Sequence, residues 1–374
     1  MVEKMKILIC SHWMEIGGAE RALLGLLYSI DYNKNDVDLY LCRHTGEFMS
    51  QIPKEVNLLP EDPRAAAIAI PLKEVLKKGY IGIALGRILG KICTKVYVKK
   101  HKSQNSNVAI EYSNRFTYPF VKKINKGFNY DILLSFLEPH YIAAYKAYAK
   151  RKVAWMHTDY GFIDVDVHAG YKIWNRYDNI VSISEQCEKN FLLKFPRLSN
   201  KILPMENIIQ PEFIWKQALM FDAKKEMPGE IIILSVGRFA KQKNFDNIPE
   251  ICKTIRDYGL NVKWYLIGYG GEEIFIRQKI QEFKMEQYVI ILGKKENPYP
   301  YIMACDVYVQ PSRYEGKSVT VREAQILGKP VVITNYATSS SQLEDNIDGI
   351  IVPLDNHQCA KGIISLLNDR QKIK

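Results

Sequence analysis

The chain has 374 residues, of which 47% are hydrophobic and 25% charged, and its formal net charge is +11. This composition is ordinary for a soluble globular protein and excludes both a disordered chain and a disulfide-stapled scaffold. The length exceeds what one hydrophobic core usually needs, so two domains are expected. The positive charge would suit a phosphorylated ligand, an anionic lipid or a nucleic acid.

The cysteines and the lengths of the apolar runs indicate in which cellular compartment the protein resides. The seven cysteines form no CxxC pair, and their odd number predicts reduced, mostly buried thiols in the cytoplasm. The charged N-terminus leads into an apolar run too short for a signal peptide, and no uncharged apolar run is long enough to span a bilayer. We therefore expect a cytoplasmic protein, either soluble or peripheral on the inner face of the cytoplasmic membrane.

The first half of the chain alternates short apolar strands with helical patterns. "KILICS" (6–11) predicts a buried strand, and "AERALLGLLYSI" (19–30) predicts a helix that follows it after a glycine turn. Further strands are predicted at 37–42, 130–136, 152–157 and 179–184. Repeated βα units favour a parallel sheet with helices on both faces.

The same pattern restarts in the second half. Prolines punctuate the chain around 202–213, and we place the boundary there, giving domains 1–208 and 209–374. Strands are predicted at 230–239, 262–270, 288–293, 305–312, 329–334 and 348–354, and helical stretches lie between them. Two doubly wound α/β domains would face each other across a cleft, where the carboxyl ends of the strands bind ligands.

A basic amphipathic segment at 71–102 interrupts the first domain. Apolar residues recur there at mostly helical spacing, and the only acidic residue between Leu72 and Lys102 is Glu74. The segment could be a helix packed on its own domain with a solvated basic face, or a surface that meets an anionic membrane and a membrane-bound acceptor. Nucleic acid is not expected, because no recognised binding module is present. The basic residues are Lys73, Lys77, Lys78, Arg87, Lys91, Lys95, Lys99, Lys100 and Lys102.

Two glycine-containing turns after predicted strands are candidate anion sites. Gly17 and Gly18 lie between a strand and a helix, where backbone amides could bind an anion, although a turn that needs glycine explains them equally well. Arg238 and Lys243 follow a strand that ends near Gly237, and two cations on one such loop suit a diphosphate. The absence of GxGxxG disfavours a dinucleotide-dependent oxidoreductase.

A third candidate site is "EGKSVTVREA" (315–324). A helix is predicted from near Ser318 to Leu327, and its first amides could hold phosphate. Glu315 and Glu323 could then accept hydrogen bonds from sugar or ribose hydroxyls. Spacing alone favours a simpler interpretation, a solvated loop acid and a helix-surface acid.

No metal site is predicted. "DVD" occurs at 36–38 and again at 164–166, and such a triplet can hold a divalent ion against a diphosphate. Three-residue matches arise easily by chance, and we interpret both as structural.

Five motifs in order carry a resemblance over nearly the whole chain: GGAER (17–21), WMHTDY (155–160), GRFAKQKNF (237–245), EGKSVTVREA (315–324) and GKPVV (328–332). Together they resemble the retaining glycosyltransferases of glycosyltransferase family 4, of the kind that act in cell-surface polysaccharide or glycolipid synthesis. The resemblance implies a GT-B fold, in which two Rossmann-like domains face each other across a cleft. The N-terminal domain would bind the acceptor and the C-terminal domain the nucleotide sugar.

The implied reaction transfers a hexose or N-acetylhexosamine from a nucleoside-diphosphate sugar, expected to be a UDP-sugar, to a glycan or lipid-linked acceptor at the membrane. No cofactor and no metal are implied. Two alternatives stay open: a nucleotide-sugar-binding protein without transfer activity, and a sugar-nucleotide epimerase of the same fold. The chain reads "EGKSVT" where the family commonly has "EGFGLP", which leaves the sugar open.

The resemblance also assigns roles to individual residues. Arg238 and Lys243 would hold the donor diphosphate, Glu323 the ribose and Glu315 the transferred sugar. His157 would contact the donor sugar near its reacting carbon, although a lone histidine after a strand also fits a hydrogen-bonded structural residue. The implied catalytic residues are His157, Arg238, Lys243 and Glu315. The implied donor-binding residues are Gly17, Gly18, Gly237, Arg238, Lys243, Lys294 (near the base), Glu315, Gly316, Lys317, Ser318, Val319 and Glu323.

Overall fold

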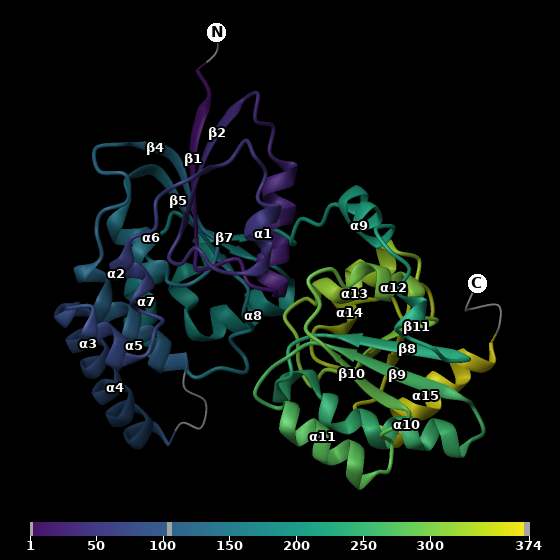
Figure 1. Ribbon diagram of the computed structural model, residues 1–374. Helices are drawn as coiled ribbons and strands as arrows, with labels where there is room; N and C mark the ends of the chain where they lie inside the picture. Colours follow the sequence, from purple (N-terminus) through teal and green to yellow (C-terminus); the bar gives the residue numbers. More distant parts are fainter. Residues whose placement is uncertain (1–2, 103–106, 370–374) are drawn as a thin grey trace. The chain divides into compact units, whose positions relative to one another are not determined.

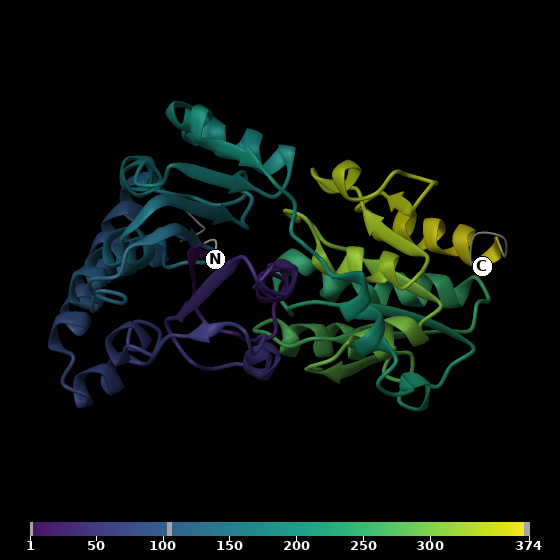
Figure 2. The ribbon, with the colours of Figure 1, turned by 90° about the horizontal axis from the view of Figure 1, so that it is seen from above.

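The computed structural model describes residues 3–102 and 107–369, and the chain divides into two compact units, Met1–Ile208 and Ile209–Lys374. This division coincides with the boundary placed from the sequence, while the acceptor and donor roles of the two units stay predictions. Each unit contains one parallel sheet, and helices cover both of its faces (Figures 1 and 2).

The first unit contains a seven-stranded parallel sheet in the order β3-β2-β1-β4-β5-β6-β7. The strand order reverses between β1 and β4, whose residues pair from Ile7 opposite Ile132 onward. The strands are β1 (Met5–Ser11), β2 (Asn35–Leu41), β3 (Asn57–Leu58), β4 (Tyr130–Ser135), β5 (Ala149–Met156), β6 (Asn179–Ser182) and β7 (Ile202–Pro204). The helices are α1 (Gly18–Ser29), α2 (Pro63–Ala66), α3 (Leu72–Lys77), α4 (Ile81–His101), α5 (Asn107–Thr117), α6 (His140–Lys146), α7 (Val167–Trp174) and α8 (Glu185–Lys194).

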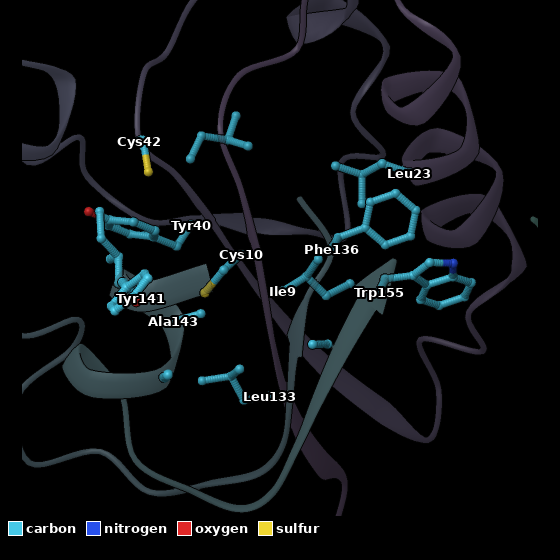
Figure 3. Packing of buried hydrophobic residues seen from close by; sticks show 14 of the residues in the cluster. Ile9, Cys10, Leu23, Tyr40, Cys42, Leu133, Phe136, Tyr141, Ala143 and Trp155 are labelled. Atoms are coloured by element: carbon cyan, nitrogen blue, oxygen red, sulfur yellow. The ribbon is translucent and has the colours of Figure 1, made fainter. Parts of the chain in front are cut away.

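The core of the first unit lies along β1, β4 and β5. Ile9, Leu133 and Trp155 are buried there, and Phe136 packs on Trp155 with ring centroids 4.9 Å apart (Figure 3). Because helices cover both faces of a parallel sheet, its central strands read as continuous apolar runs. Six of the seven cysteines are buried and all seven are free thiols, as the sequence predicted.

The second unit contains a six-stranded parallel sheet in the order β10-β9-β8-β11-β12-β13, and the strand order reverses between β8 and β11. All six predicted strands are present, each shorter than its predicted range. They are β8 (Ile231–Val236), β9 (Val262–Ile267), β10 (Val289–Gly293), β11 (Val307–Gln310), β12 (Val331–Thr334) and β13 (Ile350–Val352). The helices are α9 (Pro211–Ala218), α10 (Ile248–Asp257), α11 (Glu273–Glu282), α12 (Tyr299–Ala304), α13 (Val319–Ile326), α14 (Ser339–Gln342) and α15 (Asn356–Asn368).

Successive strand residues of the second unit enter two different cores. Ile233 and Trp264 pack in the cluster that includes residues of α10 and α15, whereas Leu234 and Tyr265 pack with α12 and α13. Figure 1 shows these helix groups on opposite faces of the sheet. Side chains alternate between the faces of a strand, so runs such as "IIILSV" are apolar throughout because both faces are covered.

The basic segment 71–102 forms two helices instead of one continuous stretch. α3 and α4 are separated at 78–80, where Gly79 has a φ of +74°, a conformation that favours glycine. A glycine of α4 allows close packing against α5: a Cβ on Gly86 would lie 2.4 Å from the Phe116 carbonyl oxygen of α5. Among the described residues, no helix is both long enough and apolar enough to cross a membrane.

Candidate functional site

Two loops of the second unit flank the point where its strand order reverses. The loop after β8 carries Gly237, Arg238 and Lys243, and the loop between β11 and α13 carries Glu315 to Ser318. In open α/β sheets, ligands bind at such reversal points, beyond the carboxyl ends of the strands. The fold therefore brings together two motifs that are about seventy positions apart in the sequence.

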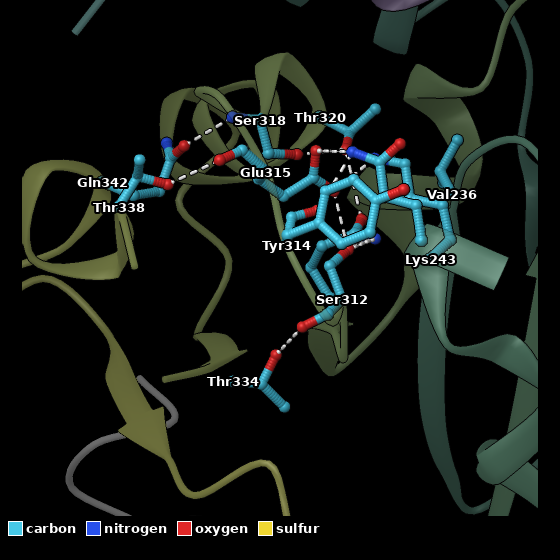
Figure 4. Close-up of polar contacts among 12 residues, drawn as sticks. Val236, Lys243, Ser312, Tyr314, Glu315, Ser318, Thr320, Thr334, Thr338 and Gln342 are labelled. Carbon is cyan, nitrogen blue, oxygen red and sulfur yellow. Dashed lines mark hydrogen bonds and ion pairs between the residues drawn. The ribbon is translucent and has the colours of Figure 1, made fainter. Parts of the chain in front are cut away.

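Lys243 and Glu315 join these loops by a buried ion pair. Lys243 Nζ lies 2.5 Å from Glu315 Oε1, and the two side chains are 16% and 7% exposed (Figure 4). Ser312 Oγ donates to the same carboxylate oxygen at 2.6 Å, and Gln242 Nε2 donates to the other at 3.3 Å. Buried charges require such partners. The interpretation of Glu315 as a solvated loop acid is therefore wrong.

Gly237 and the loop after β9 make room for this pair. A Cβ on Gly237 would lie 3.3 Å from Lys243 Cε, so the missing side chain lets the lysine stem cross the end of β8. In the next loop, a Cβ on Gly268 would lie 1.9 Å from the Gly237 carbonyl oxygen, and one on Gly270 would lie 2.3 Å from that of Phe239. The two loops thus pack backbone against backbone, a role of "GYGG" (268–271) that sequence reasoning missed.

Arg238 and Arg313 behave differently in these two loops. Arg313 holds Asp246 with two hydrogen bonds of 2.9 and 2.7 Å, which ties the loop after β11 to the loop after β8. Arg238 is exposed, and its guanidinium has no hydrogen-bond or ion-pair partner among the described residues. A bidentate pair such as that of Arg313 is structural, whereas Arg238 is free to bind an external anion.

Side chains in and next to α14 bind the backbone at the start of α13. Ser318 occupies the N-cap position, as predicted, but its backbone amide donates to Gln342 Oε1 at 2.7 Å (Figure 4). Thr338 Oγ1 donates to the Glu315 carbonyl at 2.8 Å. An anion that bound the Ser318 amide would have to displace the Gln342 carboxamide.

The other predicted residues of the second unit lie on α13 and after β10. Glu323 is buried, and one of its carboxylate oxygens accepts a hydrogen bond of 2.9 Å from the Tyr299 hydroxyl, so it is not a helix-surface acid. Lys294 is exposed on the loop after β10, and its Nζ lies 4.5 Å from the centroid of the Tyr269 ring. This contact is a cation–π interaction. Gly316 and Lys317 are partly exposed beside Glu315, and Val319 is the first residue of α13.

In the first unit, Gly17 and Gly18 begin α1. Gly17 is the N-cap residue and has an extended backbone that any residue adopts, so the turn itself does not require glycine. A Cβ on Gly17 would instead lie 2.1 Å from Glu20 Oε2. The Glu20 carboxylate accepts a hydrogen bond of 3.0 Å from Trp13 Nε1. Gly17 therefore leaves room for an anionic side chain of this chain at the start of the helix, where negative charge is stabilised.

His157 follows β5 directly, and its ring packs on Phe136 at a centroid distance of 4.6 Å. Burial, followed by the neighbouring His140, lowers the pKa of His157 to about 3, against the opposing effect of a hydrogen bond to the Phe136 backbone. The buried Nε2 atom has no hydrogen-bond partner among the described residues. His157 is therefore neutral near pH 7, and a neutral imidazole has one ring nitrogen that accepts a hydrogen bond.

The described residues contain no group of three or more His, Cys, Asp or Glu side chains suited to hold a metal ion. The aspartates of the two "DVD" triplets make structural contacts. Asp38 accepts hydrogen bonds from the Asn57 carboxamide and the Tyr130 hydroxyl, and Asp166 caps α7 by accepting the His168 and Ala169 amides.

Residues 217–374 match the family described as "Glycosyl transferases group 1". The matched stretch covers most of the second unit. It contains both loops at the reversal point, together with Arg238, Lys243, Glu315 and Glu323.

Curated relatives match parts of the chain. One is the N-acetylgalactosamine-N,N'-diacetylbacillosaminyl-diphospho-undecaprenol 4-alpha-N-acetylgalactosaminyltransferase of Campylobacter jejuni, 28% identical over 199 residues, which are 53% of each chain. Another is the amylovoran biosynthesis glycosyltransferase AmsK of Erwinia amylovora, 28% identical over 144 residues, which are 36% of this chain and 35% of that one. The chain thus spans about half the length of the first of these relatives and about a third of the second.

Solved structures match the whole chain. Anabaena HepE in complex with UDP and glucose has a TM-score of 0.68 at 15% identity, with 99% of this chain and 91% of that chain covered. A Staphylococcus aureus TarM variant in complex with Fondaparinux, alpha-GlcNAc-glycerol and UDP has a TM-score of 0.68 at 14% identity, with 99% and 94% covered. These similarities show the fold: two Rossmann-like α/β domains of the GT-B class, as the sequence predicted.

Proposed function

We propose that the chain is a retaining glycosyltransferase of family 4 that transfers a hexose or N-acetylhexosamine from a UDP-sugar to a glycan or lipid-linked acceptor. The observation that carries the proposal is the buried Lys243–Glu315 pair at the strand-reversal point, within the stretch that matches the group 1 glycosyl transferases. Arg238 lies on the same loop as Lys243, and its guanidinium has no partner among the described residues. The UDP in the HepE and TarM structures supports the choice of base. The diphospho-undecaprenol in the name of the Campylobacter jejuni relative supports a lipid-linked acceptor.

Arg238 and Lys243 would stabilise the leaving group. In the proposed step, the bond between the anomeric carbon and the diphosphate oxygen breaks, and its electron pair leaves with the diphosphate. The acceptor hydroxyl oxygen forms the new bond on the same face and loses its proton to the departing oxygen. Fixed cations that face developing negative charge account for much of the rate in such reactions. Lys243, already held by Glu315, would need little reorganisation to meet a phosphate.

The remaining site residues would hold the donor by its hydroxyl groups. Carboxylates accept hydrogen bonds from hydroxyls, which suits Glu315 to the transferred sugar and Glu323 to the ribose. His157 is neutral, and its Nε2 would accept a hydrogen bond from a hydroxyl of the donor sugar. The amides of Gly17 and Gly18 would approach the diphosphate, and Lys294 would lie near the base.

We also propose that the transfer needs no metal or other cofactor, because the two cations Arg238 and Lys243 would supply the positive charge at the diphosphate. The test is transfer or slow donor hydrolysis measured before and after dialysis against EDTA. Unchanged turnover supports the proposal. Turnover that disappears with EDTA and returns with manganese overturns it.

The proposed activity is tested by measuring release of the nucleoside diphosphate from a panel of UDP-, GDP- and ADP-sugars, with and without lipid-linked acceptors. One UDP-sugar should be turned over by the wild type and by Lys241→Ala, a control with an exposed lysine on the same loop, but not by Arg238→Ala. Binding of a sugar nucleotide without release would favour the binding-protein alternative. Isomerisation of the sugar without transfer would favour the epimerase.

A further inference from the structure

α4 presents a row of large apolar side chains to solvent. The row recurs at positions i, i+4, i+7, i+8, i+11 and i+15, which lie within about one third of the circumference of a helix with 3.6 residues per turn. Its members are Ile81 (63% exposed), Leu85 (59%), Ile88 (40%), Leu89 (44%), Ile92 (53%) and Val96 (62%). We call these six residues the outer row of α4. Clustered apolar exposure on this scale marks an interaction surface, whereas isolated exposed residues do not.

The opposite face of α4 fixes the direction in which the outer row points. Ile83 is buried, and Gly86 and Gly90 approach the backbone of α5, which runs beside α4 in Figure 1. The Tyr97 hydroxyl donates to the Val165 carbonyl at 3.0 Å, and the Arg87 guanidinium donates to the Ile70 carbonyl. The helix is therefore anchored to the first unit through one face, and the outer row is the face that remains.

The surroundings of the outer row carry positive charge. Lys91 and Lys95 lie along one edge of the row and Lys100 along the other, when successive residues are placed 100° apart around the helix. These lysines are exposed, and none has an ion-pair partner in the part of the chain that the structure describes. The adjoining α3 and its end add Lys73, Lys77 and Lys78, and Glu74 is the only acidic residue from 72 to 102.

We propose that α4 lies in the surface of an anionic phospholipid bilayer, parallel to its plane. The outer row would enter the boundary between headgroups and acyl chains, and the flanking lysines would contact lipid phosphates. An apolar face edged with cations is typical of helices that lie on a membrane, and no described helix is able to span one. This inference rests on the proposed function, because the same membrane would carry the lipid-linked acceptor. Binding of α4 to lipid, however, requires neither the donor nor sugar transfer.

A second copy of this chain fits the outer row less well than lipid does. A symmetric dimer places the same surface patch against itself, so the two outer rows would bring their flanking lysines together. Juxtaposed like charges oppose such an interface. An anionic lipid surface instead supplies the opposite charge along the whole helix.

The test is co-sedimentation of the full chain with vesicles, in the absence of nucleotide sugars. Vesicles of phosphatidylcholine mixed equally with phosphatidylglycerol should bind the wild type, and pure phosphatidylcholine vesicles should bind it much more weakly. The double variant Leu85→Glu/Ile92→Glu should lose at least about 100-fold in affinity, because each buried methylene of a membrane anchor contributes roughly 4-fold. Lys91→Gln/Lys95→Gln should lose about 25-fold, since each basic residue near an anionic surface contributes about 5-fold.

The matched control is Leu193→Glu/Ile274→Glu. These apolar residues are 81% and 74% exposed on α8 and α11, and the control changes the net charge by the same amount as the outer-row variant. The control should bind anionic vesicles nearly as well as the wild type. Thermal denaturation of each variant checks the fold.

Three results would overturn the proposal. The first is no binding of the wild type to anionic vesicles. The second is an equal loss of binding in Leu193→Glu/Ile274→Glu, which would mean that the change in net charge, and not the outer row, explains the lost affinity. The third is a lipid-free dimer that Leu85→Glu/Ile92→Glu converts to a monomer, which would make the outer row a contact between copies. Donor turnover is measured separately, so failure of the membrane surface and failure of the proposed activity give different results.

Discussion

Lys243 Nζ and Glu315 Oε1 lie 2.5 Å apart and connect the two loops that diverge at the strand reversal of the second unit. A buried ion pair contributes little net stability compared with apolar residues of the same shape, because both charges lose their hydration. Removing one partner, in contrast, leaves the other charge buried without compensation. We propose that the pair instead serves to position Lys243, which would then contact the donor diphosphate.

Arg238→Ala should abolish most turnover without affecting the fold. The guanidinium is exposed and has no partner among the described residues, so its loss should change the free energy of unfolding by less than about 0.5 kcal/mol. Loss of one group that stabilises transition-state charge costs about 100- to 1,000-fold in kcat. Steady-state kinetics and thermal denaturation check this, with Lys241→Ala as the control. Normal kcat in Arg238→Ala would remove this residue from the mechanism.

Lys243→Ala should destabilise the second unit by about 3 kcal/mol, because the Glu315 carboxylate then stays buried with only its Ser312 and Gln242 hydrogen bonds. In a Glu315→Gln background, the same lysine substitution should cost less. A double-mutant cycle from urea unfolding measures this difference. Strictly additive effects would show that the two side chains do not interact in solution.

His157 should make the first unit less stable at acidic pH. The burial-lowered pKa of about 3 means that the folded state stays neutral while the unfolded histidine binds a proton below about pH 6.5. Stability is thus fully present above about pH 6.5 and is lost as the pH falls toward 3, by about 1.4 kcal/mol at about pH 5.5. His12 and His140 also have pKa values lowered by burial and act in the same direction.

Urea unfolding of the wild type and of His157→Gln across this pH range tests the effect. The variant should show a pH dependence smaller by about one proton. It should also lose turnover at neutral pH if Nε2 accepts a donor hydroxyl, because glutamine places its acceptor differently. An identical pH slope in both proteins would mean that His157 titrates normally in the fold.

Three glycines near the site should respond in a fixed order to alanine. Gly268→Ala should cost more than about 2 kcal/mol, because its φ is +156° and the new Cβ would lie 1.9 Å from the Gly237 carbonyl oxygen. Gly237→Ala should leave stability nearly unchanged but raise the KM for the donor, because its Cβ would press on Lys243. Gly271→Ala meets open space and is the control. Equal effects at the three positions would contradict the packing described.

Much of the fold follows from local patterns in the sequence. Most strands of the two sheets are apolar runs between helical patterns, because helices cover both faces of each sheet. This alternation predicts the two domains and the order of strands and helices in each. β3 and β7 were missed, since elements of two and three residues carry no periodic signal. The packing role of Gly86 was also missed, because it depends on the position of α5, which sequence spacing does not reveal.

The site was only partly predictable. Arg238, Lys243 and Glu315 were identified from their places after strands, but the contact between the last two joins residues that are far apart in the sequence. Spacing alone favoured solvated roles for Glu315 and Glu323, and burial by the surrounding chain overrides that interpretation. Gln342 was not identified, because nothing local indicates that its side chain reaches the Ser318 amide.

Isothermal titration calorimetry of the full chain with a panel of nucleotide sugars tests the central claim, binding of a UDP-sugar at the Arg238 and Lys243 loop, most directly. The account predicts saturable binding of one UDP-sugar to the wild type and to Lys241→Ala, with affinity reduced by about 10-fold or more in Arg238→Ala and Lys243→Ala, because each loses a charged contact to the diphosphate. No binding of any nucleotide sugar to the folded wild type, or equal affinity in all four proteins, would contradict it.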